Sequence, residues 1–425
     1  MRNREQDTIV NTRILRVVLG TVAAIIVVGA AFLIGLREGG RAPSGGRELA
    51  QGGGQTGEAQ APLTAPALQS NSGEGSAEAL GHRGVEFTHF RVGNRNIKAM
   101  FSERKIVWVG TSGGVVRYDT ETDDYRLFDV RSGLLSNGIF HLSKLGDKLV
   151  VGTYGGGVSL LDESGESWTN YNIQHGLADA FVYDFLELDN GDVWIATWSG
   201  ANRIVGGNLD DRGKWETHTV ENTGGGLPND WVYALAKGRN GEVWMATEGG
   251  LARFDDGEWQ SWKHSDGLGA PYELVKSQIE FTQDPAKESS HHARQKVEMG
   301  LEEVDIAYNP NYIVALLVDQ DGVVWCGTWG GGLARFDGTS WKYYTVADGL
   351  PANHVFMLGR ESKGRLWVGT SNGMARFDGK DFTNFSVNDG LFARSVFSMT
   401  YAHDGSLWVG SYGGVSRLVG LGKAN

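Results

Sequence analysis

The sequence predicts an all-β fold, a seven-bladed β-propeller closed by an N-terminal strand. The first observation is a phrase written seven times: a hydrophobic pair or Trp, then Gly or Ala, Thr or Ser, and a glycine-rich turn. Its copies begin at Trp108, Val150, Trp194, Trp244, Trp325, Trp367 and Trp408. The second observation is the spacing between copies, which is 42, 44, 50, 81, 42 and 41 residues. A period in the low forties with short strands is typical of β-propellers.

Each repeat is expected to supply four strands. Around Trp367 the strands are predicted at 355–358, 366–370, 374–377 and 382–387, separated by short polar or glycine-containing turns. Pairs such as Asn190-Gly191 and Asp404-Gly405 supply the positive φ that hairpin turns need. The first strand of each unit is predicted to lie nearest the centre of the ring.

The third observation concerns the two ends of the repeat region. The last unit stops at 415–419 without a fourth strand, and the segment FTHFRV at 87–92 resembles FTNFSV at 382–387. The N-terminal segment is therefore predicted to complete the last blade, which would close the ring and remove its exposed edges.

The spacing of 81 residues is nearly two periods. The segment from about 270 to 310 has no Trp and no glycine turn, so it is not predicted to be an eighth blade. We expect a partly helical insertion in one loop between blades.

Composition limits the classes of protein to consider. The 425 residues include 63 Gly and 14 Trp but only 8 Pro, which suits many tight turns joining aromatic strands. One large ring is favoured over several domains, because each repeat must bury its faces against its neighbours. A net charge of −12 argues against a nucleic-acid partner.

The N-terminal region predicts a membrane anchor. Residues 17–36 are twenty uncharged residues, enough to span a bilayer as a helix. Arginines on both sides favour a cytoplasmic tail at 1–16. A signal peptide cleaved after Ala30 or Ala31 is the alternative, but the apolar run continues through Ile34. Residues 37–84 are predicted to be a disordered, flexible linker, followed by the propeller at 85–419 and a short tail at 420–425.

The repeats resemble the two-component regulator propeller, found in periplasmic sensor regions of bacterial hybrid histidine kinases. The resemblance rests on the seven phrases and on three Asp-Gly-Leu triplets that begin at Asp266, Asp348 and Asp389. It covers about 85–419 and implies a ligand-binding sensor on the periplasmic side of the bacterial inner membrane. In that family the propeller usually precedes a partner domain and a kinase. This sequence ends at Asn425, directly after the last repeat, so we expect a separate signalling partner.

Binding residues are expected where turns and loops between blades emerge on one face. The residue directly after the Thr or Ser of each phrase varies among aromatic, acidic and small types: Ser112, Tyr154, Trp198, Glu248, Trp329, Ser371 and Tyr412. Exposed aromatic rings with a carboxylate suit stacking on a sugar or gripping a peptide. The alternative is that these side chains pack on adjacent loops.

Polar residues precede the innermost strands on the same face. They are Arg95, Asn137, Asp230, Asn311, Asn353 and Arg394. Such groups can give a binding site its specificity, although Asn and Asp also stabilise turns by bonding to the backbone. The predicted binding residues are Tyr154, Trp198, Glu248, Trp329, Tyr412, Arg95, Asp230, Arg394 and His354.

The sequence assigns no catalytic residue, metal or cofactor. His291 and His292 have no third ligand at a suitable spacing, and Asp319 and Asp321 lack the downstream Glu of a calcium loop. The single cysteine, Cys326, occupies a position that is Val, Ile or Met in other repeats, so we expect a buried apolar role.

The favoured function is a membrane-anchored, extracytoplasmic and non-catalytic propeller. Its partner would be a glycan, a peptide or an envelope protein. One alternative is a metal-dependent lyase or hydrolase, because streptogramin lyases are also propellers and His354 adjoins the predicted face. Another is a structural scaffold in an envelope assembly, with the insertion as its docking element.

Overall fold

The structure is a computed structural model that describes residues 70–71, 84–281, 284–287, 290–361 and 364–421. The predicted membrane segment at 17–36 and nearly all of the predicted linker lie outside these residues. Within the described part, no helix has both the length and the apolar character needed to cross a membrane. The chain divides into two compact units, and the described residues between 281 and 307 belong to the smaller one.

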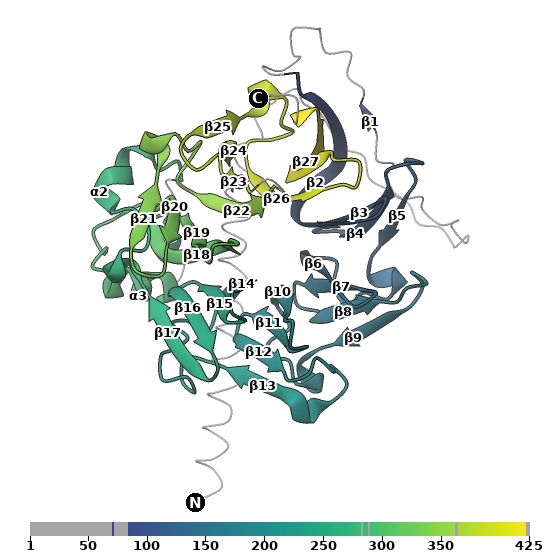
Figure 1. The fold of residues 1–425 in the computed structure, drawn as a ribbon, viewed down its shortest axis with the longest axis horizontal. Helices are drawn as coiled ribbons and strands as arrows, with labels where there is room; N and C mark the ends of the chain where they lie inside the picture. The colour runs from purple at the N-terminus through teal and green to yellow at the C-terminus, as the bar shows by residue number, and fades with distance from the viewer. Residues whose placement is uncertain (1–69, 72–83, 282–283, 288–289, 362–363, 422–425) are drawn as a thin grey trace, which may run out of the picture. The chain divides into compact units, whose positions relative to one another are not determined.

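The larger unit is built of antiparallel sheets arranged in a ring (Figure 1). Five of them are separate four-stranded blades, each ordered along the chain. Their strands are β6 (Ile139–Leu145), β7 (Lys148–Thr153), β8 (Val158–Leu161) and β9 (Trp168–Tyr171); β10 (Val182–Glu187), β11 (Val193–Thr197), β12 (Gly200–Ile204) and β13 (Trp215–His218); β14 (Val232–Lys237), β15 (Val243–Thr247), β16 (Gly250–Asp255) and β17 (Glu258–Trp262); β18 (Asn309–Val318), β19 (Val324–Trp329), β20 (Leu333–Phe336) and β21 (Trp341–Tyr344); β22 (Val355–Arg360), β23 (Leu366–Thr370), β24 (Gly373–Phe377) and β25 (Phe382–Phe385).

The sixth sheet has seven strands, in the order β26-β27-β2-β3-β4-β5 with β1 paired to β2. Its strands are β1 (Ser70–Asn71), β2 (Glu86–Glu103), β3 (Ile106–Thr111), β4 (Gly114–Asp119), β5 (Tyr125–Phe128), β26 (Val396–Tyr401) and β27 (Leu407–Val419).

The prediction of seven separate blades is therefore wrong: the structure has five four-stranded blades and one seven-stranded sheet. The physical reason is β2, a single strand of 18 residues. Its first part pairs with β27, where Glu86 lies opposite Val419, and its last part pairs with β3, where Glu103 lies opposite Ile106. The expected pairing of the N-terminal segment with the C-terminal strand is present. Because the strand continues without a break, it merges the two ends of the ring into one sheet.

The constant part of the repeated phrase is explained by packing. The Thr hydroxyl is buried and donates to a glycine carbonyl in the same turn, as Thr197 does to Gly200 O at 2.7 Å and Thr370 to Gly373 O at 2.8 Å. The Trp side chain is buried, and an Arg of the next strand lies over its ring, as Arg203 does over Trp194 at 6.0 Å. The recurring residues thus hold each second and third strand together.

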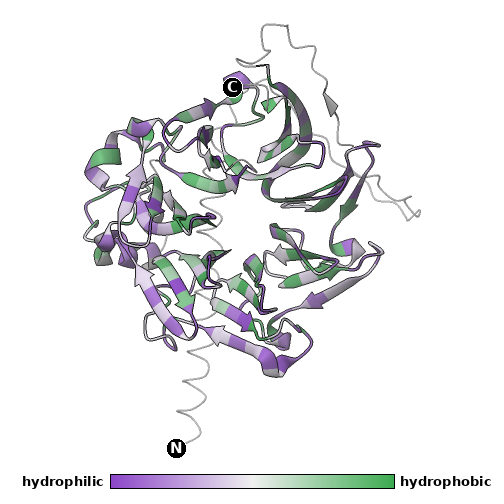
Figure 2. Cartoon of the chain, in the orientation of Figure 1, coloured by the Kyte–Doolittle hydropathy of each residue, from purple (hydrophilic) through white to green (hydrophobic). Residues whose placement is uncertain are grey.

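Hydrophobic residues fill the spaces between neighbouring sheets. Second strands such as β11 are entirely buried, whereas the outermost strands β13 and β17 are largely exposed. Figure 2 shows the same gradient, with hydrophilic residues on the outermost strands. Cys326 is fully buried in β19, and burial raises the pKa of its thiol, in agreement with the expected apolar role.

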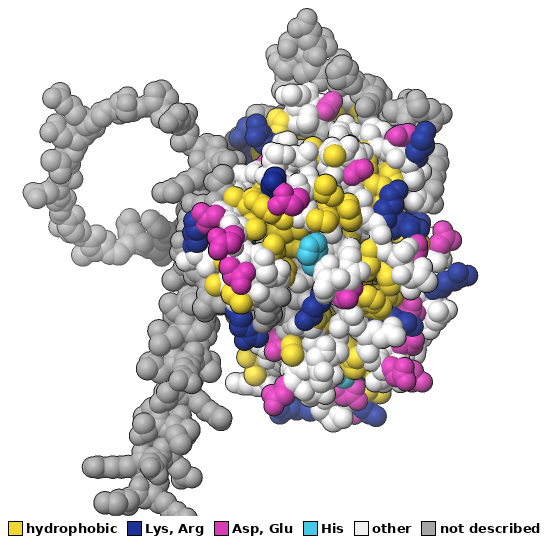
Figure 3. All heavy atoms as spheres, turned by 90° about the vertical axis from the view of Figure 1, so that its left-hand side faces the viewer, with side chains coloured by type: hydrophobic (Ala, Val, Ile, Leu, Met, Phe, Trp, Pro, Cys, Tyr) yellow, Lys and Arg dark blue, Asp and Glu magenta, His cyan; other side chains and the backbone are white. Residues whose placement is uncertain are grey.

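The outer surface carries charges of both signs. On the face seen in Figure 3, the described Lys and Arg side chains are interspersed with Asp and Glu, and hydrophobic side chains gather between them. This mixed pattern differs from the basic stripe by which proteins bind the nucleic-acid backbone.

The segment predicted to be a partly helical insertion contains short helices. In the larger unit it contains α2 (Tyr272–Val275) and a 3-10 helix (Lys276–Gln278). In the smaller unit it contains a 3-10 helix (Pro285–Lys287) and α3 (Ser290–Glu298). The buried Lys296 of α3 is paired with Asp284 at 2.5 Å and donates to the Ile306 carbonyl at 3.1 Å. These bonds compensate for removing the lysine charge from water.

Candidate functional site

One position in each innermost strand forms the inner belt. Its residues are Lys98, Phe140, Tyr183, Tyr233, Val314, Phe356 and Phe397, and all are partly exposed. Each follows a buried apolar residue, such as Val182 before Tyr183 or Val232 before Tyr233. A shift in the strand pairing falls at each of these positions, as at Tyr183 between Val182 and Asp184, and the innermost strands surround the ring centre in Figure 1. The inner belt therefore consists of bulged residues on the strands nearest that centre.

Side chains of the inner belt touch from one sheet to the next. The rings of Phe140 and Tyr183 are stacked with centroids 4.7 Å apart, and those of Tyr183 and Tyr233 are 4.8 Å apart. On the other side of the ring, Phe356 stacks on Phe397 at 5.5 Å. Such contacts fix the orientation of each ring before any ligand arrives.

A second group of aromatic residues, the turn row, lies at the ends of the same strands. It consists of residues that follow the Thr of the repeated phrase and residues directly before the buried residue that precedes the inner belt: Tyr154, Phe181, Trp198, Trp231, Tyr312 and Trp329. Phe181 lies between Tyr154 and Trp198 at 4.6 and 4.7 Å. The stacked rings of Tyr312 and Trp329 are 5.5 Å apart. The predicted residues Tyr154, Trp198 and Trp329 are thus parts of one aromatic arrangement.

The expectation of an exposed rim is wrong for two of the predicted residues. Trp198 is 6% exposed, because Phe181 and Trp231, which directly precede β10 and β14, pack against its ring. Its Nε1–H has no acceptor among the described residues. Glu248 is fully buried, and its Oε2 accepts a hydrogen bond from the Tyr233 hydroxyl at 3.3 Å. The alternative of packing on neighbouring segments explains both burials.

Glu248 also affects the neighbouring tyrosines. Burial is the main reason that the pKa of Tyr233 and of Tyr312 is raised, and the negative charge of Glu248 is the second. Both phenols therefore remain neutral hydrogen-bonding groups across the physiological pH range. The carboxylate of Glu248 is therefore buried against Tyr233 and is not exposed on a rim.

Asp230 has a structural role shared with the asparagines at the same position. Its Oδ1 accepts a hydrogen bond from the backbone N–H of Val220 at 2.7 Å. Asn137, Asn311 and Asn353 bond in the same way to the N–H groups of Val130, His264 and Val346. Each bond holds the loop that enters an innermost strand, which is the turn chemistry weighed from the sequence.

The remaining predicted residues are placed differently. Arg95 is partly exposed, and its guanidinium lies against the Cα of Gly113, where an added Cβ would stand 2.3 Å from Cζ. Arg394 is exposed, and Tyr412 is partly exposed opposite Asn96 in the strand pairing. His354 is 1% exposed, with its ring edge-on to Trp329 at 5.1 Å, so it does not reach the surface.

Lys98 is the functional candidate that the sequence analysis missed. Its Nζ lies 4.8 Å from the centroid of the Phe140 ring. Burial lowers the pKa of its ammonium group from 10.5 to about 8. Protein surrounds the side chain, yet part of its surface stays accessible. A position-by-position comparison of innermost strands would have found it, because Phe, Tyr or Val stands there in the other strands.

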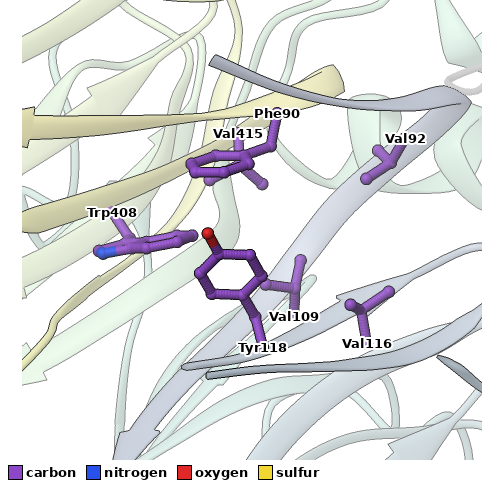
Figure 4. Close-up of a pocket in the computed structure, with 7 residues that line it drawn as sticks. All are labelled: Phe90, Val92, Val109, Val116, Tyr118, Trp408 and Val415. Atoms are coloured by element: carbon purple, nitrogen blue, oxygen red, sulfur yellow. The ribbon is translucent and has the colours of Figure 1, made fainter. Parts of the chain in front are cut away.

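A small cavity lies away from this surface, where β2 and β27 meet β3 and β4 (Figure 4). Its volume is about 10 Å³ and its lining is apolar, with Phe90, Tyr118 and Trp408 among the lining side chains. It has room for about one water molecule and offers no polar partner to hold one, so it is a packing gap. In the described part of the chain, no three His, Cys, Asp or Glu side chains stand together as a metal site.

Comparisons with known proteins show which family the repeats resemble. The family model of the two component regulator propeller matches residues 226–249, 307–330 and 349–372. The extracellular domains assigned to two hybrid two component systems from B. thetaiotaomicron have the same fold. One superposes with a TM-score of 0.58 at 19% identity, the other with 0.54 at 15%, and each match covers 77% of this chain and 39% of that one.

A catalytically inactive virginiamycin B lyase from Staphylococcus aureus, solved with quinupristin, is also similar in fold. The TM-score is 0.55 at 11% identity, over 79% of this chain and 99% of the lyase. No curated protein matches the chain at a significant level. The resemblance seen in the sequence is thus confirmed, and the propeller carries two-component regulator propeller repeats.

Proposed function

We propose that this chain is a membrane-anchored, extracytoplasmic propeller that binds a ligand or protein at the ring centre and does no catalysis itself. The observation that carries the proposal is the inner belt, in which partly exposed aromatic side chains of consecutive innermost strands contact one another. Ligand sites are typically lined by aromatic and apolar side chains with a few polar groups. Here the polar group is Lys98, and the Tyr183 hydroxyl adds a donor and an acceptor.

The pre-arranged rings favour affinity. Phe140, Tyr183 and Tyr233 each contact the next ring along the belt, so their rotamers are restricted before binding. Binding then loses less side-chain entropy than it would on a mobile surface. Tyrosine also offers a wide apolar face with a polar end, which suits a ligand of mixed character.

The relatives and the sequence support a proposal for location and signalling. The similar solved domains are extracellular parts of two component systems. Residues 17–36 would anchor the chain in the bacterial inner membrane, and the linker would hold the propeller outside it. We infer that a separate membrane protein receives the signal when the ring is occupied.

The test is a binding screen of the detergent-extracted full chain against glycans, peptides and envelope proteins. Any ligand found should bind at least tenfold more weakly to Tyr183→Leu and to Phe356→Leu. The matched control is Tyr125→Leu on the outer strand β5, where the side chain is 37% exposed and affinity should be unchanged. Equal affinity in all four proteins, or no binder in the screen, would contradict the proposal.

The same preparation tests the lyase alternative. Metal-dependent turnover of a candidate substrate, lost in His354→Ala or Glu248→Ala, would favour that alternative over a pure binding role. The scaffold alternative instead predicts that deleting 270–309 abolishes an envelope assembly while the ring remains folded.

A further inference from the structure

We propose that the inner belt takes an organic anion, whose acid group binds Lys98 and whose planar apolar body packs on Phe140 and the neighbouring rings. This inference rests on the proposed function and names the chemical class of its ligand. Its starting point is the unusual position of one lysine.

Lys98 differs from the other enclosed lysines of the chain. Lys296 is paired with Asp284 at 2.5 Å, and Lys144 with Glu103 at 2.6 Å. For Lys98 the described residues provide no carboxylate within ion-pair distance and no hydrogen-bond acceptor; its contact is the face of Phe140 at 4.8 Å. Burial without a partner disfavours a charged group, and a cation–π contact offsets only part of that cost. An anionic ligand would supply the missing partner.

Two further cations stand near the ends of the same pair of strands. Arg95 and Arg394 occupy equivalent positions, each two residues before the buried residue that precedes the inner belt, Ile97 in β2 and Val396 in β26. The two strands are neighbours, because Ser398 of β26 donates to the Ile97 carbonyl at 2.8 Å. Within the described residues neither guanidinium forms an ion pair. Two neighbouring strands thus carry three cations without carboxylate partners among the described residues, although the chain has a net charge of −12.

The belt beside Lys98 suits a planar group. Phe140 is stacked on Tyr183 at 4.7 Å and meets Tyr154 at 5.5 Å, so a continuous aromatic surface begins under the ammonium group. A ligand that places its acid group at Lys98 would lay an aromatic or conjugated body on this surface. Hydrophobic contact and charge pairing would then act together.

At neutral pH Lys98 can act as the cation. Burial lowers its pKa to about 8, so most molecules keep the ammonium charge at pH 7. The cost of enclosing this charge is present in the empty protein and is relieved when an anion binds.

The experiment compares two small probes on the full chain in detergent. The probes are 2-naphthoate, which has an acid group, and 2-naphthalenemethanol, which has the same ring system without a charge. We expect the wild-type protein to bind the acid at least tenfold more tightly than the alcohol by fluorescence titration. In Lys98→Met the affinity for the acid should fall to that for the alcohol, and the alcohol should bind as before.

The control is Lys380→Met, which removes a lysine whose side chain is 89% exposed and should leave both affinities unchanged. Lys98→Gln, checked by thermal unfolding, guards against misfolding of the first variant. No binding of the acid, equal binding of the two probes, or an unchanged acid affinity in folded Lys98→Met and Lys98→Gln would overturn the inference. A neutral ligand that loses affinity in Tyr183→Leu would then leave the proposed function standing.

Discussion

The ammonium nitrogen of Lys98 lies 4.8 Å from the centroid of the Phe140 ring, which belongs to the next innermost strand. Lysine is rarely enclosed without a carboxylate partner, since its charge is strongly hydrated. Here the partner is an aromatic face, and the surrounding belt is aromatic too.

Replacing Lys98 should stabilise the empty protein at neutral pH. Burial lowers the lysine pKa from 10.5 to about 8. Below pH 8 the group is protonated in both states, so the folded state bears the full cost. Lys98→Met should raise the free energy of unfolding at pH 7 by about 2 kcal/mol, below the limit of about 3 kcal/mol that the pKa difference sets.

This gain should shrink as the pH rises. Between pH 8 and 10.5 the unfolded chain holds the Lys98 proton more tightly than the folded protein, so wild-type stability increases relative to Lys98→Met. Urea unfolding of both proteins at pH 7 and pH 10 measures the change. A gain of equal size at the two pH values would show that charge burial is not its cause.

Thr370→Val tests the hydrogen bond that recurs in the glycine turns. The substitution keeps the shape of the side chain but removes the donor to Gly373 O, at 2.8 Å, and the acceptor for Asn372 N–H, at 3.1 Å. We expect a loss of about 1–2 kcal/mol in unfolding free energy, because the turn is buried. Thr169→Val on the exposed side of β9 is the control, for which urea unfolding should show almost no change.

Phe90→Ala tests the joining of the two chain ends. Phe90 of β2 stacks on Trp408 of β27 with centroids 5.0 Å apart, and both line the small apolar cavity. Removing the ring enlarges a gap that is already present, so unfolding free energy should fall by about 3–5 kcal/mol. Tyr125→Ala on β5 should cost less than 1 kcal/mol by the same denaturation assay. Similar losses in the two variants would mean that the ring closure is not specially dependent on Phe90.

Lys296→Met should loosen the smaller unit only. The change leaves the buried carboxylate of Asp284 without its cation, which typically costs about 3–5 kcal/mol. Hydrogen exchange of residues 290–307 should become much faster, while the sheets of the larger unit keep their protection. Slow exchange throughout the variant would contradict the role given to this ion pair.

The sequence was sufficient for the repeated local chemistry but not for the connection between chain ends. Trp194, Thr197 and Gly200 recur because packing and turn geometry demand those residue types, so their pattern predicts strands and turns. The count of separate blades depended on β2. Gly93 and Asn94 are turn-forming types, and nothing in their identity indicates that an extended strand passes through them.

The candidate site shows a similar division. Trp198 was predicted as a candidate because the residue type at its position varies between repeats, while the residues before it are nearly constant. Its burial depends on Phe181 and Trp231, which other parts of the sequence supply. Lys98 was missed because its interest as a binding residue depends on contacts with the next innermost strand, such as that with Phe140. Asp230 illustrates the opposite case, since a polar residue before a strand was explained by local backbone bonding alone.

Because β2 is continuous, its pairing at one end affects which of its side chains lies beside Phe140 at the other. The half of β2 that pairs with β27 and the half that carries Lys98 belong to one continuous strand. Sliding the strand by a single residue would move Lys98 away from the Phe140 ring and bring Ile97 or Ala99 to its position. The pairing of Glu86 with Val419 at the far end therefore helps to hold Lys98 at its place beside Phe140.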